Sequence, residues 1–382
     1  MKIFPMFKVH VNKEAALQRI GEVFDSGFIN EGEQVAEYAA ALKARLGSAQ
    51  LVLTNSGTAA LTLALVLCGV EAGTNVVSTP MTCVASNTPI ANLKADIVWT
   101  DVDPDSGMPR ACDIAAKIND RTRAVLIVDW AGVPAELEEI QRVCTERGVK
   151  LIQDAAHAFG AEYKGRPVAC WTDFTMFSLQ AIKHMTTGDG GALFCRSEGD
   201  FELAKKLKWF GLDREKAKDA AGNWKGQQAE ADILPGEVGY KFNMNNIAAA
   251  IGLSQLPYID GILAAHRRNA AVYQKAFADI PHLVKPMAQP DGSLPSYWVY
   301  TQILQGTGHD RDTVVQQLVA QGIHAGVVHV PNQHYAAFAP FMTDLPGVDA
   351  FSSRQFSLPC GWWLSEEDAA HIAGALRKIL VA

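Results

Sequence analysis

Residues 177–191 read Phe177-Ser178-Leu179-Gln180-Ala181-Ile182-Lys183-His184-Met185-Thr186-Thr187-Gly188-Asp189-Gly190-Gly191. One lysine, Lys183, stands among apolar and aromatic residues, and a turn with three glycines follows it, which lets the backbone come close to a ligand. Burial disfavours the charged form of a lysine, so the neutral amine becomes available to form a Schiff base and to carry protons. The commoner alternative is a lysine whose stem packs while its head reaches water.

Upstream of this stretch, Asp154 ends the apolar run Leu151-Ile152-Gln153. A carboxylate at that position is partly buried and needs a cationic partner. The protonated pyridine nitrogen of pyridoxal phosphate is such a partner, and a lysine that holds the aldehyde is the other main requirement of that cofactor. Lys183 and Asp154 together therefore predict a pyridoxal phosphate site, although an aspartate in this place also suits a helix N-cap.

Between about residues 50 and 195, short β-rich runs alternate with helical patterns such as Ala59–Cys68 and Ala135–Arg147. This alternation predicts an α/β fold with a mostly parallel sheet flanked by helices, in which ligands gather beyond the carboxyl ends of the strands. The expected strands are Leu51–Thr54, Asn75–Thr79, Ile97–Thr100, Ala124–Val128, Lys150–Gln153, Asp173–Ser178 and Ala192–Cys195.

Polar and small residues follow two of these strands. Ser56-Gly57-Thr58 joins a strand to a helix, so free backbone N–H groups and the positive end of the helix dipole face an anion there. Ser178 and Gln180 follow a second strand. Ser and Thr are also ordinary N-caps, but the position of both groups at strand ends favours a phosphate site.

The remainder of the chain predicts a second, smaller domain. Residues 199–216 are expected to form a helix and 217–236 a loop, and Pro257 is expected to interrupt the chain after the small-residue helix Asn245–Leu256. We expect a large domain over residues 1–256 and a small one over 257–382. The elements expected in the small domain are Asp260–Phe277, Trp298–Leu304, Asp312–Gln321 and Glu366–Leu380.

Composition and charge indicate which partners, location and metal sites to expect for this protein. The chain has 382 residues, 48% of them hydrophobic, and a net charge of -7 without a basic cluster, so nucleic-acid and membrane partners are not expected. We find no apolar core of a signal peptide and no apolar run of membrane-spanning length, which predicts a cytoplasmic protein. Seven cysteines and ten histidines show no zinc-hook or HExxH spacing, so no metal site is predicted.

Taken together, these motifs resemble the DegT/DnrJ/EryC1/StrS family of sugar aminotransferases, within the aspartate aminotransferase superfamily. The resemblance covers about residues 25–256 and, more loosely, the stretch His329-Val330-Pro331. It implies the fold type I of pyridoxal phosphate-dependent transferases, a seven-stranded, mostly parallel sheet and a smaller C-terminal α+β domain. The segments that carry it are Thr54–Leu61, Asp154–Ala161, Ser178–Gly191, Gly239–Met244 and Ala248–Leu256.

The resemblance also implies roles for single residues. Lys183 would form the internal aldimine with pyridoxal phosphate, Asp154 would pair with its pyridine nitrogen, and His157 would contact its phenolic oxygen. Lys241 or Asn243 would reach the phosphate of the neighbouring subunit, so a homodimer with shared active sites is expected. The residues expected to hold the phosphate within one chain are Ser56, Gly57, Thr58, Ser178 and Gln180.

Two positions depart from the family pattern. Cys83 stands where relatives often place an aromatic ring that stacks on the cofactor, and His184 replaces a common asparagine after the lysine. His184 is either a base that faces the substrate or a polar filler. The dehydratase branch of the family has histidine in place of the lysine, so Lys183 favours transamination.

We therefore expect transfer of an amino group, from L-glutamate with 2-oxoglutarate as product, to a keto carbon of a nucleotide-linked deoxysugar, at C4 rather than C3. The alternatives are an aminotransferase for a cyclitol or other cyclic ketone without a nucleotide, and a non-catalytic regulatory member of the same fold, which Lys183 and Asp154 disfavour. The candidate substrate contacts are Phe28, Asn30, His184, Arg214, His329 and His334.

Overall fold

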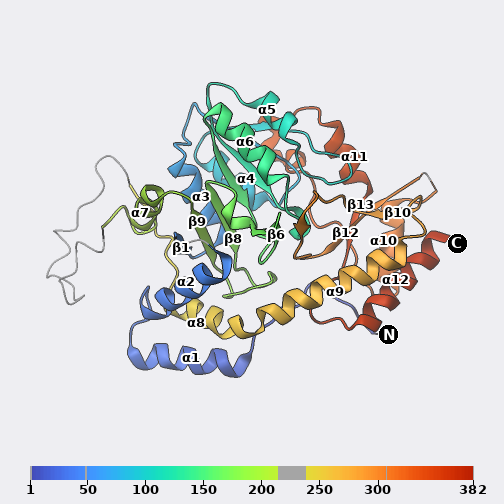
Figure 1. The fold of residues 1–382 in the computed structure, drawn as a ribbon, viewed down its shortest axis with the longest axis horizontal. Helices are drawn as coiled ribbons and strands as arrows, with labels where there is room; N and C mark the ends of the chain where they lie inside the picture. The colour runs from blue at the N-terminus through green and yellow to red at the C-terminus, as the bar shows by residue number, and fades with distance from the viewer. Residues whose placement is uncertain (1, 48–49, 214–237, 307, 382) are drawn as a thin grey trace.

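The computed structural model describes residues 2–47, 50–213, 238–306 and 308–381 (Figure 1). Its centre is a seven-stranded sheet in which only β9 runs antiparallel to its neighbours. This confirms the predicted sheet, and each of the seven expected runs contributes a strand. In spatial order the strands are β1 (Leu51–Thr54), β9 (Gly191–Cys195), β8 (Phe174–Ser178), β5 (Lys150–Asp154), β4 (Thr122–Val128), β2 (Asn75–Ser78) and β3 (Asp96–Trp99).

The strands of this sheet are buried along nearly their whole length, as expected where helices cover both faces. Helix α3 packs on β9 and β8, α6 on β5, and α7 on β1 and β9. The predicted helices Ala59–Cys68 and Ala135–Arg147 agree closely with α3 and α6, whereas α7 ends at Leu207 rather than continuing toward residue 216. The helices are α3 (Gly57–Leu67), α4 (Val84–Asn92), α5 (Ala111–Lys117), α6 (Leu137–Arg147) and α7 (Glu198–Leu207).

One long helical run crosses from the part of the chain that holds the seven-stranded sheet toward the C-terminal part (Figure 1). Helix α8 (Asn246–Gln255) continues through the 3-10 turn η4 (Leu256–Tyr258) into α9 (Ile259–Phe277). Pro257 was expected to interrupt the chain. It lies instead in the first turn of η4, where a missing N–H leaves no helical hydrogen bond unmade.

Among the described residues, the run 246–277 is long and apolar enough by length and composition to cross a membrane, which the sequence analysis did not find. Half of its apolar window is buried within the protein. It packs against α1 (Lys13–Ser26), α2 (Glu33–Leu46) and α12 (Glu366–Val381), as a core helix does.

A second hydrophobic core lies in the C-terminal part. The second half of α9, with Tyr273 and Phe277, packs there against strands and helices of residues 284–381, and Phe4 joins it. The first half of α9 belongs to the larger core, as does Trp298. The proposed boundary after residue 256 therefore falls inside a helical run and stays a prediction. The further elements of this part are β10 (Val284–Pro286), β12 (Tyr300–Leu304), α10 (Arg311–Ala320), α11 (Pro346–Arg354) and β13 (Gln355–Leu358).

A small three-stranded sheet joins the two parts of the chain. The hairpin of β6 (Glu162–Tyr163) and β7 (Arg166–Pro167) pairs with β11 (Ser293–Leu294). This pairing brings the segment before β12 close to the loop that follows Asp154. Residues 293–298 can thereby contribute to the edge of the main sheet where the predicted site lies.

Candidate active site

Lys183 lies in the loop between β8 and β9, where the backbone N–H of Lys183 donates to the carbonyl of Gln180 at 3.0 Å. The side chain is half-buried. Burial lowers the pKa of Lys183 to about 8, while the nearby Asp154 and Cys83 act in the opposite direction. A substantial fraction of this amine is consequently neutral near physiological pH, which is the form that attacks a carbonyl.

Asp154 is the last residue of β5 and is 4% exposed. Its Oδ2 accepts a 2.6 Å hydrogen bond from Ser86 Oγ, and its Oδ1 accepts one from the Ala156 N–H at 3.0 Å. Burial raises the pKa of Asp154, and these two hydrogen bonds and Lys183 oppose that rise. Ser86 was not predicted, because no spacing or motif in the sequence connects it to a carboxylate on another strand.

Two of the predicted phosphate-binding residues, Gly57 and Ser178, meet at the carboxyl end of β8. Ser56 caps α3 by accepting from the Ala59 N–H at 3.1 Å, and Gly191 pairs with both Thr54 and Ser178 in the sheet. A Cβ on Gly57 would lie 3.0 Å from Met176 Sδ and 3.3 Å from Ser178 Cβ, so glycine lets the loop approach β8 closely.

The first turn of α3 offers the backbone N–H groups that an anion needs, beside the Ser178 hydroxyl. Thr58 lies in that turn. Gln180 is exposed, and its Oε1 accepts from the Ile182 N–H at 3.1 Å, so its carbonyl oxygen shapes the turn that leads to Lys183.

Three rings form a wall beside Lys183. The His157 ring lies parallel to Trp298 with centroids 3.9 Å apart, and His329 stacks 5.4 Å from His157. Burial lowers the pKa of both histidines, that of His329 to about 4, so both are neutral. Within the described residues, His157 Nδ1 and His329 Nε2 are buried without a hydrogen-bond partner. Trp298 was expected at the start of a strand that begins instead at Tyr300, and no sequence pattern connects it with the site.

His184 is 5% exposed, and its Nε2 lies 3.1 Å from the carbonyl oxygen of Ser296. Its ring centroid lies 4.6 Å from that of His266 on α9. The side chain is thus packed between the lysine loop and α9. This packing supports the polar filler of the two interpretations and does not support a substrate contact.

Lys241 and Asn243 lie beside the loop that follows β1. The Asn55 N–H donates to the carbonyl of Phe242 at 2.7 Å, and Asn243 forms a bridge with Thr54. Asn243 Nδ2 also donates to Asn30 Oδ1 at 3.0 Å, and Lys241 Nζ donates to Asn243 Oδ1. A contact of Lys241 or Asn243 with the phosphate of a second subunit stays a prediction.

Two of the other residues expected to contact the substrate are exposed. Phe28 is 44% exposed and follows α1, and His334 is exposed in the 3-10 turn η5 (Asn332–His334). Asn332 ties that turn to the loop before α4 by donating to the Thr82 carbonyl at 2.7 Å. Arg214 lies outside the described residues, as does the predicted loop 217–236.

These residues fit pyridoxal phosphate. Asp154 is a buried carboxylate suited to a protonated ring nitrogen, the unpartnered His157 nitrogen suits a phenolic oxygen, and Gly57 and Ser178 suit a phosphate. Cys83, half-buried at the N-terminus of α4, supplies no ring for stacking. The aromatic ring nearest to the Lys183 amine in the described contacts is Trp298, at 3.7 Å.

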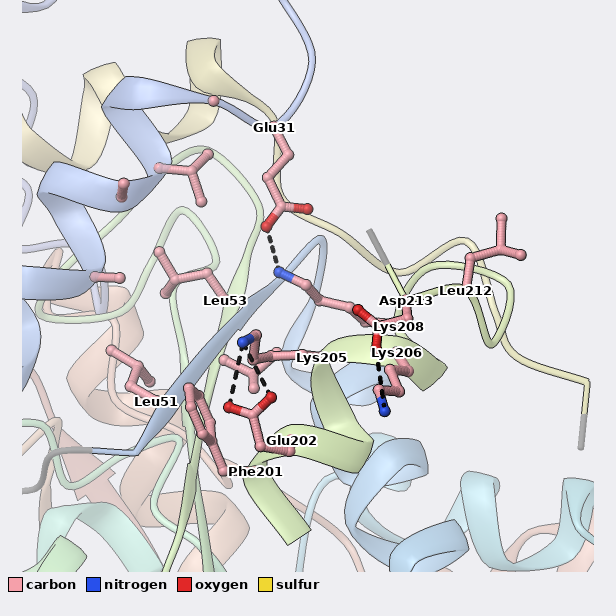
Figure 2. A pocket seen from close by; sticks show the side chains of 15 residues that line it. Glu31, Leu51, Leu53, Phe201, Glu202, Lys205, Lys206, Lys208, Leu212 and Asp213 are labelled. Carbon is pink, nitrogen blue, oxygen red and sulfur yellow. Dashed lines mark hydrogen bonds and ion pairs between the residues drawn. The ribbon is translucent and has the colours of Figure 1, made fainter. Parts of the chain in front are cut away.

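A separate cavity lies between α2, β1 and α7 and contains none of the predicted cofactor residues (Figure 2). Its lysines are matched by carboxylates: Lys205 with Glu202 at 3.1 Å, and Lys208 with Glu31. Lys206 is likewise paired with Asp213 at 3.4 Å, so each of the three lysines that line this cavity has a carboxylate partner.

Comparison with known proteins agrees with this geometry. The model of the DegT/DnrJ/EryC1/StrS aminotransferase family matches residues 10–377. The chain belongs to this family. It is a sugar aminotransferase and depends on pyridoxal phosphate, as the family does.

Three relatives illustrate the similarity. A dTDP-4-dehydro-2,3,6-trideoxy-D-glucose 4-aminotransferase of Saccharopolyspora spinosa is 30% identical, over 95% of this chain and 93% of the relative. The crystal structure of the sugar aminotransferase CalS13 from Micromonospora echinospora matches with a TM-score of 0.89 and 34% identity, covering 98% of this chain and 99% of CalS13. Spr1654 of Streptococcus pneumoniae in its PMP-form matches with a TM-score of 0.88 and 25% identity, covering 98% of each chain.

Proposed function

We propose that this sugar aminotransferase moves an amino group from L-glutamate to the C4 keto carbon of a nucleotide-linked deoxysugar. The observation that carries the proposal is the similarity, over nearly the full length of both chains, to an enzyme named for 4-amination of a dTDP-linked keto sugar. Lys183 and Asp154 lie together at the strand ends, so the chain retains the groups that transamination requires.

Asp154 and Lys183 have different parts in the proposed reaction. Pyridoxal phosphate, when bound, supplies an electron sink that stabilises negative charge at the substrate carbon. Asp154, held by Ser86 and Ala156, provides the negative charge that keeps the cofactor ring nitrogen protonated. The neutral Nζ of Lys183 takes the proton from the substrate carbon of the amino donor in the first half-reaction, and in the second half-reaction Lys183 delivers a proton to the former keto carbon of the sugar.

The imidazoles suit this chemistry because they stay neutral. Burial of the rings lowers the pKa of His157 and that of the half-buried His329, so neither adds positive charge next to Lys183. The His157 nitrogen without a partner would bond an oxygen of the cofactor ring, and Gly57, Thr58 and Ser178 would hold the phosphate. His329 and the exposed His334 are proposed to face the sugar nucleotide.

Two half-reactions test the proposal. Holoenzyme treated with L-glutamate alone should lose its visible absorption band and release 2-oxoglutarate. A dTDP-linked 4-keto-deoxysugar should then restore the band, and NMR of the product should place nitrogen on C4. Nitrogen on C3, or turnover only with a cyclic ketone lacking a nucleotide, would contradict the assignment. A protein that binds the cofactor without responding to any amino donor would be the non-catalytic alternative.

A further inference from the structure

Trp298 makes an unusual set of contacts for a core tryptophan. The side chain is 3% exposed and lies just before β12, far from Lys183 in the sequence. Its indole N–H donates to the carbonyl oxygen of Ile182 at 2.8 Å. Ile182 immediately precedes Lys183, so this hydrogen bond holds the backbone from which the lysine side chain starts.

The same indole also contacts the far end of the lysine. Lys183 Nζ lies 3.7 Å from a ring centroid of Trp298. An ammonium over an aromatic face is attracted by the ring quadrupole. Trp298 therefore contacts both the Lys183 amine and the carbonyl of the residue that precedes Lys183.

Two further rings fix the orientation of Trp298. His157 stacks on it at an interplanar angle of 13°, and Phe7 stacks on it with centroids 4.6 Å apart at 24°. Phe7 belongs to the N-terminal segment, whose Pro5 carbonyl accepts a hydrogen bond from Trp363 at 3.1 Å. The indole plane is thus set by packing and by its own N–H.

We propose that Trp298 is a positioning residue for the lysine: it holds the backbone of Lys183 through the Ile182 carbonyl and seats the amine on its ring face beside His157. The inference rests on the role of Lys183 in the proposed function. It does not depend on which sugar is aminated.

The test measures capture of pyridoxal phosphate by the apoprotein, without amino donor or sugar, followed as the rate of appearance of the visible band between pH 6 and pH 10. Trp298→Phe keeps a ring face and loses the N–H. Trp298→Met loses both and fills part of the volume. Trp171→Phe is the matched control, because Trp171 packs against Tyr163 and Arg166 rather than against Lys183. Thermal unfolding of each variant is measured alongside.

For Trp298→Phe we expect an unchanged midpoint of the pH profile and a plateau rate about threefold lower, because only the backbone anchor is lost. For Trp298→Met we expect a plateau about tenfold lower and a midpoint at lower pH, because the ring that favours the ammonium is gone. Trp171→Phe should match the unchanged protein in both the midpoint of the pH profile and the plateau rate.

A midpoint that moves to higher pH in Trp298→Met would show that Trp298 only keeps water away, and would overturn the positioning role. An unchanged plateau rate in Trp298→Phe would also overturn the positioning role. If Trp298→Met does not fold, the result for Trp298→Phe alone decides whether Trp298 positions the lysine. Either failure leaves the sugar reaction of the unchanged protein intact. If the unchanged protein does not capture pyridoxal phosphate on Lys183, that result would instead contradict the proposed function.

Discussion

Ser86 Oγ donates a 2.6 Å hydrogen bond to Oδ2 of Asp154, and both residues are buried. The contact joins the first turn of α4 to the end of β5. It stabilises the carboxylate form of Asp154 against burial, which raises the pKa of that group. An ionised Asp154 is what a protonated cofactor ring nitrogen requires.

Asp154→Asn should keep the fold and remove the charge that keeps the ring nitrogen protonated. We expect kcat to fall by roughly 10³-fold or more, because that charge supports the electron sink itself. Stopped-flow bleaching by L-glutamate measures the effect. Near-normal turnover of the Asn variant would mean that Asp154 has another role.

Ser86→Ala is a milder change at the same site than Asp154→Asn, and its effect on kcat should be smaller. It leaves the carboxylate and removes one hydrogen bond, a loss of about 1–2 kcal/mol that corresponds to roughly tenfold in kcat. Because the pKa of Asp154 should rise further, the loss should be greatest at the acidic end of the pH range. An equal loss at every pH would point to misplacement of α4 instead.

The sheet and the Lys183–Asp154 pair were predictable because they depend on local pattern. Alternating apolar runs define strands, and residues that follow parallel strands share an edge. Ser86 and Trp298 were not predictable in the same way. Each reaches the site through pairing of segments distant in the chain, and hydrogen bonds and ring stacking of that kind leave no periodic signal. The predicted interruption at Pro257 was wrong, because a proline is equally compatible with the first turn of a helix.

Lys183 should capture pyridoxal phosphate faster as the pH rises, with a midpoint near pH 8. The neutral amine is the reactive form, and burial lowers the pKa of Lys183 to about 8. Asp154 acts in the opposite direction, so Asp154→Asn should move the midpoint to lower pH. The rate of band formation in apoprotein checks both expectations, and borohydride reduction with peptide mapping should place the cofactor on Lys183. An adduct on Lys205, Lys206 or Lys208 would contradict the site.

Gly57→Ala should weaken the phosphate cradle. The added Cβ would lie 3.0 Å from Met176 Sδ and 3.3 Å from Ser178 Cβ, so the loop must move away from β8. We expect roughly a tenfold higher Kd for pyridoxal phosphate and a loss of about 1–3 kcal/mol in the free energy of unfolding. Gly21→Ala in α1 is the control, because a Cβ there meets nothing within 4 Å. Equal effects of the two substitutions would show that Gly57 is not part of the phosphate site.

Asn243→Ala and Lys241→Ala test the predicted sharing of sites between two subunits. Each should raise the Kd for pyridoxal phosphate if its side chain reaches a phosphate. Because Lys241 Nζ donates to Asn243 Oδ1, removing either side chain disturbs the other, and the two losses should be less than additive. Absorbance titration of the single and double variants measures this coupling.

Mixing decides whether the contact crosses the interface. A hybrid of an Asn243→Ala subunit with a Lys183→Ala subunit contains one site with both lesions and one intact site if Asn243 serves the partner's cofactor. Activity should then rise above that of either parent toward half of the unchanged dimer. If each site belongs to a single chain, every site in the hybrid carries one lesion. Activity that stays at the parental level, with subunit exchange verified by mass spectrometry, would therefore assign Asn243 to its own chain, where its bridge to Thr54 already places it beside the loop of Ser56 and Gly57.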